Sequence, residues 1–381
     1  MIASAAVSLA NWLWGMAEKL LLVSLSLGVA LIALELGLRL FWGGFYLKDA
    51  EPYATGSETR GWRNLPDTVA RRGEPEFVFT ASHDALGHRT DPGAAARPAA
   101  EKRVFVLGDS FAYGIGVQDD ETFCARLEQL DPRLDAFNGG VTGYGTGQEL
   151  LQLRDEGEAV QPDAVVIAFF WNDVGNSYNR DFPHFQLVDG ELREPGRKRA
   201  AAAAPPRSER REYLRHSYAY RFISDRLKMS TYAIRLMLGF PVESADFVSD
   251  AERDEAWALT RELVRAIRDE AERLGAHTLV AIIPDQVQVE PDVQILGLDA
   301  ADYEIQDRMF EIGAAIGLPV IDLRDPLRAD FEAYGQRLYF RKDRHLTVRG
   351  NRVVARALQQ ALDGLLFGSA PRSPIHVSSR S

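Results

Sequence analysis

The sequence predicts an α/β fold in which a mainly parallel, five-stranded sheet is covered by helices on both faces. Between residues 103 and 367, short and continuously apolar segments alternate with longer amphipathic segments of helical periodicity. Strands that are apolar throughout are typical of parallel sheets buried on both sides. Hydrophobic residues make up 46% of the 381 residues, which is enough to build a sizeable core around such a sheet.

Five strands are expected in the alternating region, each ending near Gly, Asp or Pro, as strands commonly do. The expected strands are residues 103–109, 134–140, 163–173, 276–284 and 318–323. The expected helices are residues 121–130, 146–160, 254–275, 303–317 and 347–367. Because the strands are parallel, their carboxyl ends meet at one edge of the sheet, where the sites of such folds lie.

The N-terminal region predicts a membrane-spanning helix. No charge occurs from Leu20 to Leu34, and the apolar character continues to Trp42. A helix from residue 20 to 42 would be roughly 34 Å long, at about 1.5 Å per residue, which is enough to cross a bilayer. Glu35 and Arg39 interrupt the apolar run, but their i,i+4 spacing lets them pair. A cleavable signal peptide would need a basic start and a small-x-small site, which we do not find, so residues 1–42 are expected to be an uncleaved anchor.

The remaining segments divide the chain further. Residues 43–102 are expected to be a connecting region, and residues 103–368 the α/β domain. A basic insertion around residues 176–250 interrupts the alternation, and its stretch 192–216 carries eight Lys/Arg against three Glu. A solvated insertion is favoured over a lid that recruits an acidic glycan, because charge runs are usually solvated. The tail, residues 369–381, is expected to be disordered.

Charge and cysteine content exclude several classes of function. The formal net charge of −11 opposes binding to nucleic acid. Cys124 is the single cysteine, so internal disulfides, CxxC zinc sites and thiol redox pairs are excluded. The glycines of "GYGTGQ" suggest a dinucleotide-binding loop, but Gln148 stands where that motif has its third Gly, and the loop follows the second strand rather than the first. We therefore expect no cofactor and no metal.

Candidate catalytic residues follow the first and last elements of the predicted domain. The first strand ends in Gly-Asp-Ser, which presents Ser110 at the carboxyl edge of the sheet. A nucleophilic serine needs a base and a group that orients the base. Of the seven histidines, His345 lies in a polar loop just before the last helix, two residues after Asp343. This placement favours Ser110, His345 and Asp343 as a catalytic set.

Oxyanion donors are expected from the ends of the next two strands. Gly143 lies in "NGGVTGYGTG", where glycines let a backbone N–H face a ligand, and Asn172 offers a side-chain amide. Taken singly, the glycines could serve a tight turn, and Asn172 could cap a loop. The prediction rests on the convergence of Ser, Gly and Asn at one edge of one sheet.

These residues make the chain resemble the SGNH (GDSL-type) hydrolase superfamily. The matching blocks, in the order of that family, are "GDSF" at 108–111, "VTGYGT" at 141–146, "ND" at 172–173 and "DRH" at 343–345. The resemblance implies a flavodoxin-like three-layer α/β/α sandwich. It also implies site roles: Ser110 as nucleophile, His345 as base, Asp343 as its orienting acid, and an oxyanion hole from the N–H groups of Ser110 and Gly143 and the amide of Asn172. Asp109 would shape the turn.

The sequence departs from the usual pattern of that superfamily in two places. Phe170 stands where the third block has Gly, and the last block is Asp-x-His rather than Asp-x-x-His. The shorter spacing, the anchor and the segment "DALGHRTDP", residues 84–92, resemble membrane-anchored bacterial envelope proteins similar to alginate O-acetyltransferase. Phe170 suggests a narrower or more apolar site beside Asn172. The resemblance implies a periplasmic domain and is preferred over counting positive charges, which alone would place it in the cytoplasm.

The combined expectation is an acyl-ester hydrolase or O-acyltransferase that works through an acyl-enzyme on Ser110. Its substrate would be an envelope glycan, another acylated carbohydrate or a small ester. The alternative is a non-catalytic glycan-binding or scaffold protein of envelope polysaccharide assembly.

Overall fold

The computed structural model describes most of the chain. The described residues are 2–42, 52–74, 76–93, 100–179, 185–194, 217–227 without 221 and 225, 249–293 and 304–368. The expected tail, 369–381, and most of the expected insertion lie outside them. Two compact units result: one combines residues 1–46 with 206–242, and the other combines residues 47–205 with 243–381.

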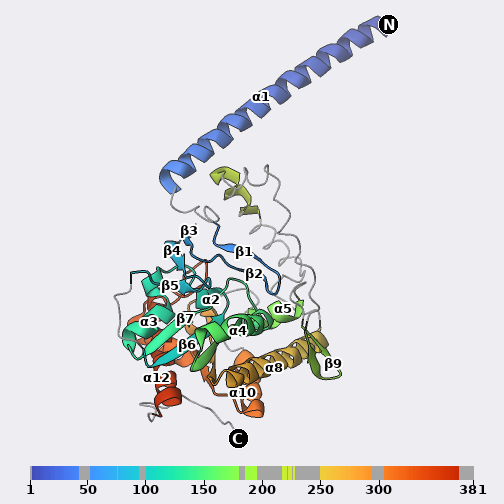
Figure 1. Cartoon of the computed structure of the whole chain (residues 1–381). Helices are drawn as coiled ribbons and strands as arrows, with labels where there is room; N and C mark the ends of the chain where they lie inside the picture. Colours follow the sequence, from blue (N-terminus) through green and yellow to red (C-terminus); the bar gives the residue numbers. More distant parts are fainter. Residues whose placement is uncertain are drawn as a thin grey trace. The chain divides into compact units, whose positions relative to one another are not determined.

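The larger unit is built around one eight-stranded sheet with the strand order β12-β11-β8-β6-β7-β5-β4-β3. Strands β3 to β7 of this sheet are labelled in Figure 1. The five expected parallel strands are confirmed. They are β6 (Lys102–Gly108), β7 (Leu134–Asn138), β8 (Ala164–Phe169), β11 (His277–Ile282) and β12 (Val320–Asp322). β6 is central and pairs in parallel with both β7 and β8, so the end of β6 lies between the ends of its two neighbours.

Three antiparallel strands extend this sheet beyond β7: β3 (Val69–Glu74), β4 (Phe77–His83) and β5 (Arg89–Thr90). They come from the region expected to be a connecting segment, and β5 joins the parallel part through the pairing of Arg89 with Asn138. A further hairpin, β1 (Ala54–Ser57) and β2 (Gly61–Asn64), precedes them. Residues 54–90 therefore belong to the larger unit.

Helices cover both faces of the sheet, which confirms the predicted three-layer arrangement. Side chains along β6 alternate between two cores, with Val104 and Val106 on one face and Phe105 and Leu107 on the other. The first core includes α3 (Phe123–Leu130) and α12 (Val348–Phe367), and the second includes α4 (Thr146–Val160), α8 (Asp250–Arg273) and α10 (Glu304–Ile316). Shorter elements complete this unit: α2 (Ser110–Tyr113), η1 (Asp119–Glu121), α5 (Asn172–Asn179), β9 (Gln186–Val188), β10 (Glu191–Arg193), α9 (Gln286–Val289) and α11 (Arg324–Tyr334).

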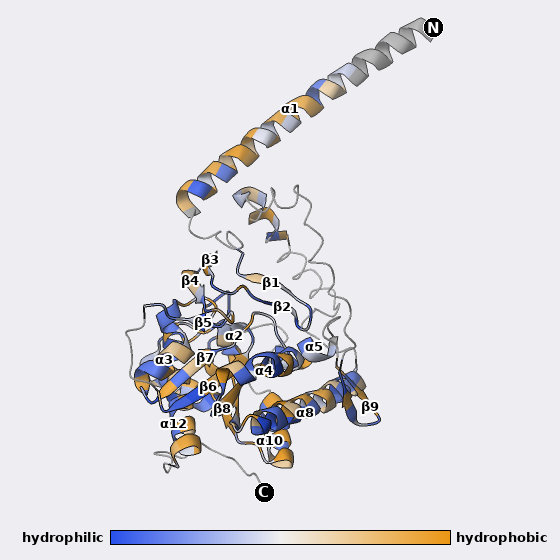
Figure 2. Ribbon diagram, in the orientation of Figure 1, coloured by the Kyte–Doolittle hydropathy of each residue, from blue (hydrophilic) through white to orange (hydrophobic). Residues whose placement is uncertain are grey.

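The smaller unit contains the N-terminal helix α1 (Ile2–Trp42), which is apolar along most of its described surface (Figure 2). Its segment Trp14–Phe41 has a mean hydropathy of 2.3 and is long and apolar enough to cross a membrane. The expected pair is present, because Arg39 Nε donates to Glu35 Oε1 at 2.7 Å. Glu35 Oε2 also accepts hydrogen bonds from Ser217 Oγ and the backbone N–H of Ala219.

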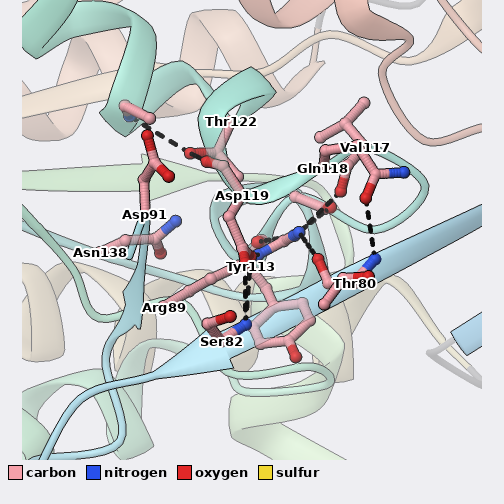
Figure 3. A network of polar contacts seen from close by, with 12 residues as sticks. Thr80, Ser82, Arg89, Asp91, Tyr113, Val117, Gln118, Asp119, Thr122 and Asn138 are labelled. Atoms are coloured by element: carbon pink, nitrogen blue, oxygen red, sulfur yellow. Dashed lines mark hydrogen bonds and ion pairs between the residues drawn. The ribbon is translucent and has the colours of Figure 1, made fainter. Parts of the chain in front are cut away.

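Arg89 fastens the antiparallel strands to the loop that follows α2 (Figure 3). The side chain is buried, and each of its five N–H groups has an acceptor at 2.5–2.9 Å. The acceptors are the carbonyl oxygens of Thr80, Tyr113, Gly114 and Val117 and a carboxylate oxygen of Asp119. A planar guanidinium has these five donors in a fixed geometry, and lysine has not.

Arg89→Ala is expected to lower the free energy of unfolding by roughly 3–5 kcal/mol, because it removes the ion pair with the part-buried Asp119 and leaves the buried carbonyls of Tyr113, Gly114 and Val117 without this donor. Arg89→Lys is expected to recover only part of the loss. Urea unfolding followed by circular dichroism measures both. The exposed Arg352→Ala is the matched control, with an expected change within about 0.5 kcal/mol. Equal stability of Arg89→Ala and Arg352→Ala would contradict the role of Arg89 in holding the antiparallel strands to the loop that follows α2.

Candidate active site

Ser110 lies at the carboxyl end of the central strand, on the first turn of α2. The preceding Asp109 is the N-cap of α2, and its Oδ1 accepts the N–H of Phe111 at 2.8 Å. Gly108 makes the sharp strand-to-helix turn possible, since a Cβ at that position would lie 2.8 Å from the Cβ of Ala112. The turn places Ser110 half-buried at the edge of the sheet.

The structure brings the three residues of the predicted catalytic set together. His345 Nε2 lies 2.7 Å from Ser110 Oγ, and His345 Nδ1 lies 2.6 Å from Asp343 Oδ1. The short Asp-x-His spacing is accommodated because Arg344, the residue between them, adopts φ = +74°, a left-handed conformation uncommon for a residue with a side chain. The backbone thereby turns back, and the Asp343 carboxylate reaches the imidazole of its near neighbour.

This geometry sets the tautomer of the imidazole. Asp343 as a carboxylate accepts the proton on Nδ1, so the neutral ring carries its lone pair on Nε2. That lone pair faces the Ser110 hydroxyl and can take its proton. The same carboxylate would stabilise the imidazolium that forms.

The two predicted oxyanion donors lie at the ends of the neighbouring strands. Gly143 sits in the turn after β7 with φ = +81°, and this loop is tied to the end of β6 because Val141 N donates to Gly108 O at 3.0 Å. Asn172 begins α5, directly after β8, and its Nδ2 donates to Asp109 Oδ2 at 3.0 Å. One carboxyl group therefore caps the helix of Ser110 and orients the amide of Asn172.

Two carboxyl groups close to one another are fully buried: that of Asp109, which precedes Ser110, and that of Glu149. Burial raises the pKa of Asp109 above its usual range, although hydrogen bonds from Phe111 and Asn172 favour its charged form. Glu149 on α4 is also fully buried, and within the described residues its two carboxylate oxygens have no hydrogen-bond partner. Burial, followed by the negative charge of Asp109, raises the pKa of Glu149 to about 8.

An aromatic layer flanks the imidazole. The ring of Phe111 lies 4.9 Å from the ring of His345 and 4.3 Å from that of Phe170, measured between centroids. The Phe170 ring also lies 5.8 Å from the ring of Trp171, measured between centroids. Phe170, which stands where the SGNH pattern has Gly, is buried in this aromatic cluster, two residues before Asn172 in the sequence.

Two residues near the site were not predicted from the sequence. Glu149 lies on the buried face of α4 together with Leu150 and Leu153. A glutamate in an amphipathic helix is normally expected on the exposed face, so the sequence did not indicate that this carboxyl is buried. Glu76, in the turn between β3 and β4, accepts hydrogen bonds from the loop that carries Asp343. This contact joins residues 267 positions apart, so no local sequence pattern predicts it.

Glu149→Gln is expected to stabilise the protein increasingly as the pH rises. The folded-state pKa of Glu149, about 8, exceeds its usual value of 4.5. Below about pH 4.5 the carboxyl is protonated in both the folded and the unfolded state and does not lower the free energy of unfolding. Between about pH 4.5 and pH 8 the unfolded state loses this proton more readily, so the free energy of unfolding falls as the pH rises. Glutamine lacks this penalty. Urea unfolding at pH 5, 7 and 9 should show the free-energy difference between variant and wild type growing with pH, and a difference independent of pH would contradict a buried titrating Glu149.

Part of the chain matches a known protein family. Residues 243–378 match the family described as the SGNH hydrolase-like domain of the acetyltransferase AlgX. No curated protein matches the chain.

Several solved structures are also similar to this chain. A member of the lipolytic protein G-D-S-L family from Veillonella parvula DSM 2008 is 12% identical, covers 70% of this chain and 99% of its own, and has a TM-score of 0.39. The acetyl xylan esterase AlAXEase is 14% identical over 68% and 99% of the two chains, with a TM-score of 0.40. LAE5, an alpha/beta hydrolase from the metagenome of Lake Arreo, is 16% identical over 71% and 98%, with a TM-score of 0.38. The resemblance indicated by the four sequence blocks is confirmed by the family match: residues 243–378, with Asp343 and His345 among them, are similar to the SGNH hydrolase-like domain of the acetyltransferase AlgX.

Proposed function

We propose that this protein is a serine-dependent acyl-ester hydrolase or O-acyltransferase that acts on an acylated envelope glycan. The observation that carries the proposal is the continuous hydrogen-bonded chain from Asp343 through His345 to Ser110, with distances of 2.6 and 2.7 Å. The family match, whose description names an acetyltransferase, supports acyl transfer as the class of reaction.

In the first half of the proposed reaction, Ser110 Oγ attacks the ester carbonyl while His345 Nε2 takes its proton. The N–H groups of Ser110 and Gly143 and the amide of Asn172 stabilise the negative oxygen of the tetrahedral intermediate, and each such donor is worth about 3 kcal/mol when removed singly. The intermediate collapses to an acyl-enzyme on Ser110. His345 returns the proton to the departing alcohol.

In the second half, a hydroxyl group attacks the acyl carbonyl on Ser110. His345 takes the proton of that hydroxyl, and the Ser110–acyl bond breaks with return of the proton to Ser110 Oγ. Water as the attacking group gives an esterase, and a sugar hydroxyl gives an O-acyltransferase. The chemistry on Ser110 is the same in both cases.

A fluorophosphonate probe is expected to label the full-length, detergent-solubilised protein at Ser110, because the probe reports a serine activated by a base. p-Nitrophenyl acetate should be hydrolysed slowly, with loss of activity in His345→Ala and a fall in kcat of roughly 10²-fold in Asn172→Ala. Peptide mass spectrometry and release of p-nitrophenol are the measurements.

Ser110→Ala is the control for both measurements, and thermal melts establish that each variant is folded. If the wild type is labelled no more than Ser110→Ala, the enzymatic proposal is contradicted. The non-catalytic glycan-binding alternative would then stand.

The acceptor decides between hydrolase and transferase. We expect an acylated carbohydrate donor to be consumed faster when an unacylated glycan is added, with no matching rise in free acyl acid. Mass spectrometry of the glycan and quantitation of the acid measure the partition. Free acid that rises in step with donor consumption, whatever glycan is present, would identify an esterase.

The same proposal places α1 in the cytoplasmic membrane as an uncleaved anchor, with the larger unit on the periplasmic side. The apolar run from Leu20 to Leu34 and the pairing of Arg39 with Glu35 support this placement. The intact mass of protein extracted from membranes is expected to include the N-terminal 42 residues. A mature chain beginning after residue 42 would show that α1 is a cleaved signal sequence instead.

A further inference from the structure

The turn between β3 and β4 contacts the loop that carries Asp343 and His345. Glu76, half-buried in this turn, accepts two hydrogen bonds on the same carboxylate oxygen. Its Oε2 lies 2.6 Å from the backbone nitrogen of Lys342 and 2.8 Å from that of Asp343. The contact brings a region outside the four family blocks against the last of them.

The loop that receives these bonds is unusually tight. Its two ends are joined because Phe340 N donates to His345 O at 2.8 Å, and Arg344 N donates to Phe340 O at 3.0 Å. Residues 341–344 must therefore reverse the chain, with Arg344 in a left-handed conformation. The reversal directs the N–H groups of Lys342 and Asp343 to one acceptor, and unpaired backbone donors of this kind cost free energy.

Asp343 is consequently held from both sides. Its backbone nitrogen is bound by Glu76, while its Oδ1 accepts from His345 Nδ1 at 2.6 Å and from His345 N at 3.3 Å. With a single residue between acid and base, the direction of the Asp343 side chain depends on the conformation of this turn. Two side chains from other elements hold this turn: Glu76 contacts it at the backbone of Asp343, and Asp285, the N-cap of α9, pairs with the side chain of Arg344.

The strand that follows Glu76 is also seated against the loop. The ring of Phe77 lies 4.6 Å from the ring of Phe340, measured between centroids. Both rings pack against Gly116, where a Cβ would lie 2.4 Å from Phe340 and 3.0 Å from Phe77. Gly116 belongs to the loop after Ser110, so the turn at Glu76 is braced on both the nucleophile side and the acid side of the site.

We propose that Glu76 is a positioning residue for the Asp343–His345 pair. Its carboxylate holds the turn in the one conformation that lets an acid two residues before the histidine reach Nδ1. The chemistry that this positioning serves rests on the proposed function.

Glu76→Ala is expected to lower kcat for p-nitrophenyl acetate roughly 10- to 100-fold with little change in KM, because small misplacements of a catalytic group have effects of this size. Glu76→Gln should restore most of the activity, since its amide oxygen still accepts both N–H groups. Glu58→Ala, at an exposed glutamate in the β1–β2 turn, is the matched control with unchanged kcat. Melting temperatures of all three variants should stay close to that of the wild type.

A double-mutant cycle separates positioning from general damage. If Glu76 acts through Asp343, then adding Glu76→Ala to Asp343→Asn should cause little further loss of kcat, so the two effects do not add. Fully additive losses, or a loss of kcat that parallels a fall in melting temperature, would overturn the proposal.

A spectroscopic readout keeps this proposal distinct from the proposed function. In the full-length protein with ¹⁵N-labelled histidine, the Nδ1–H of His345 should give a low-field proton signal that Glu76→Ala broadens or shifts and Glu58→Ala leaves unchanged. If the wild type proves inactive towards ester and probe while this signal still depends on Glu76, the enzymatic proposal fails and the positioning role stands. If the wild type is active but neither signal nor kcat responds to Glu76→Ala, the positioning role fails alone.

Discussion

The hydrogen bond between Asp343 and His345 sets the strictest requirement in this structure. An acid two residues before its histidine reaches Nδ1 only if the chain reverses between them, and Arg344 accordingly adopts φ = +74°. Such a conformation persists where surrounding contacts hold it. Here the contacts include Glu76 on the backbone N–H groups and Phe77 on Phe340, both from the antiparallel strands, and Asp285 on the side chain of Arg344.

The other half of the site depends on a different kind of constraint, a buried carboxyl group. Asp109 accepts from the N–H of Phe111 and from the amide of Asn172, so it fixes both the helix that carries Ser110 and the candidate oxyanion donor. Burial raises the pKa of each of the two carboxyls, Asp109 and Glu149, and the negative charge of Asp109 raises that of Glu149 further. Full ionisation of both at once is disfavoured, because two negative charges would then share one desolvated region.

The parallel part of the fold was predictable because its signals are local. Strands such as Ala164–Phe169 are apolar at every position, and the residues expected at their ends do lie at one edge of the sheet. β3–β5 were missed for the opposite reason, since polar residues such as Arg71 and Arg72 interrupt their apolar pattern and the strands are stabilised by pairing with the rest of the sheet. The contact of Glu76 with Asp343 could not be predicted from the sequence, because it depends on which distant segments pack together in the fold.

The antiparallel strands therefore do more than extend the sheet. Arg89 anchors their inner edge to the carbonyls that follow α2, while Glu76 and Phe77 reach the loop of His345 at their far turn. The antiparallel strands β3–β5 thus contact both the segment that follows Ser110 and the loop that carries His345. A nucleophile and a base that come from opposite ends of a domain, 235 residues apart, need such a common support, because a change of about 1 Å between them would break the 2.7 Å contact on which proton transfer depends.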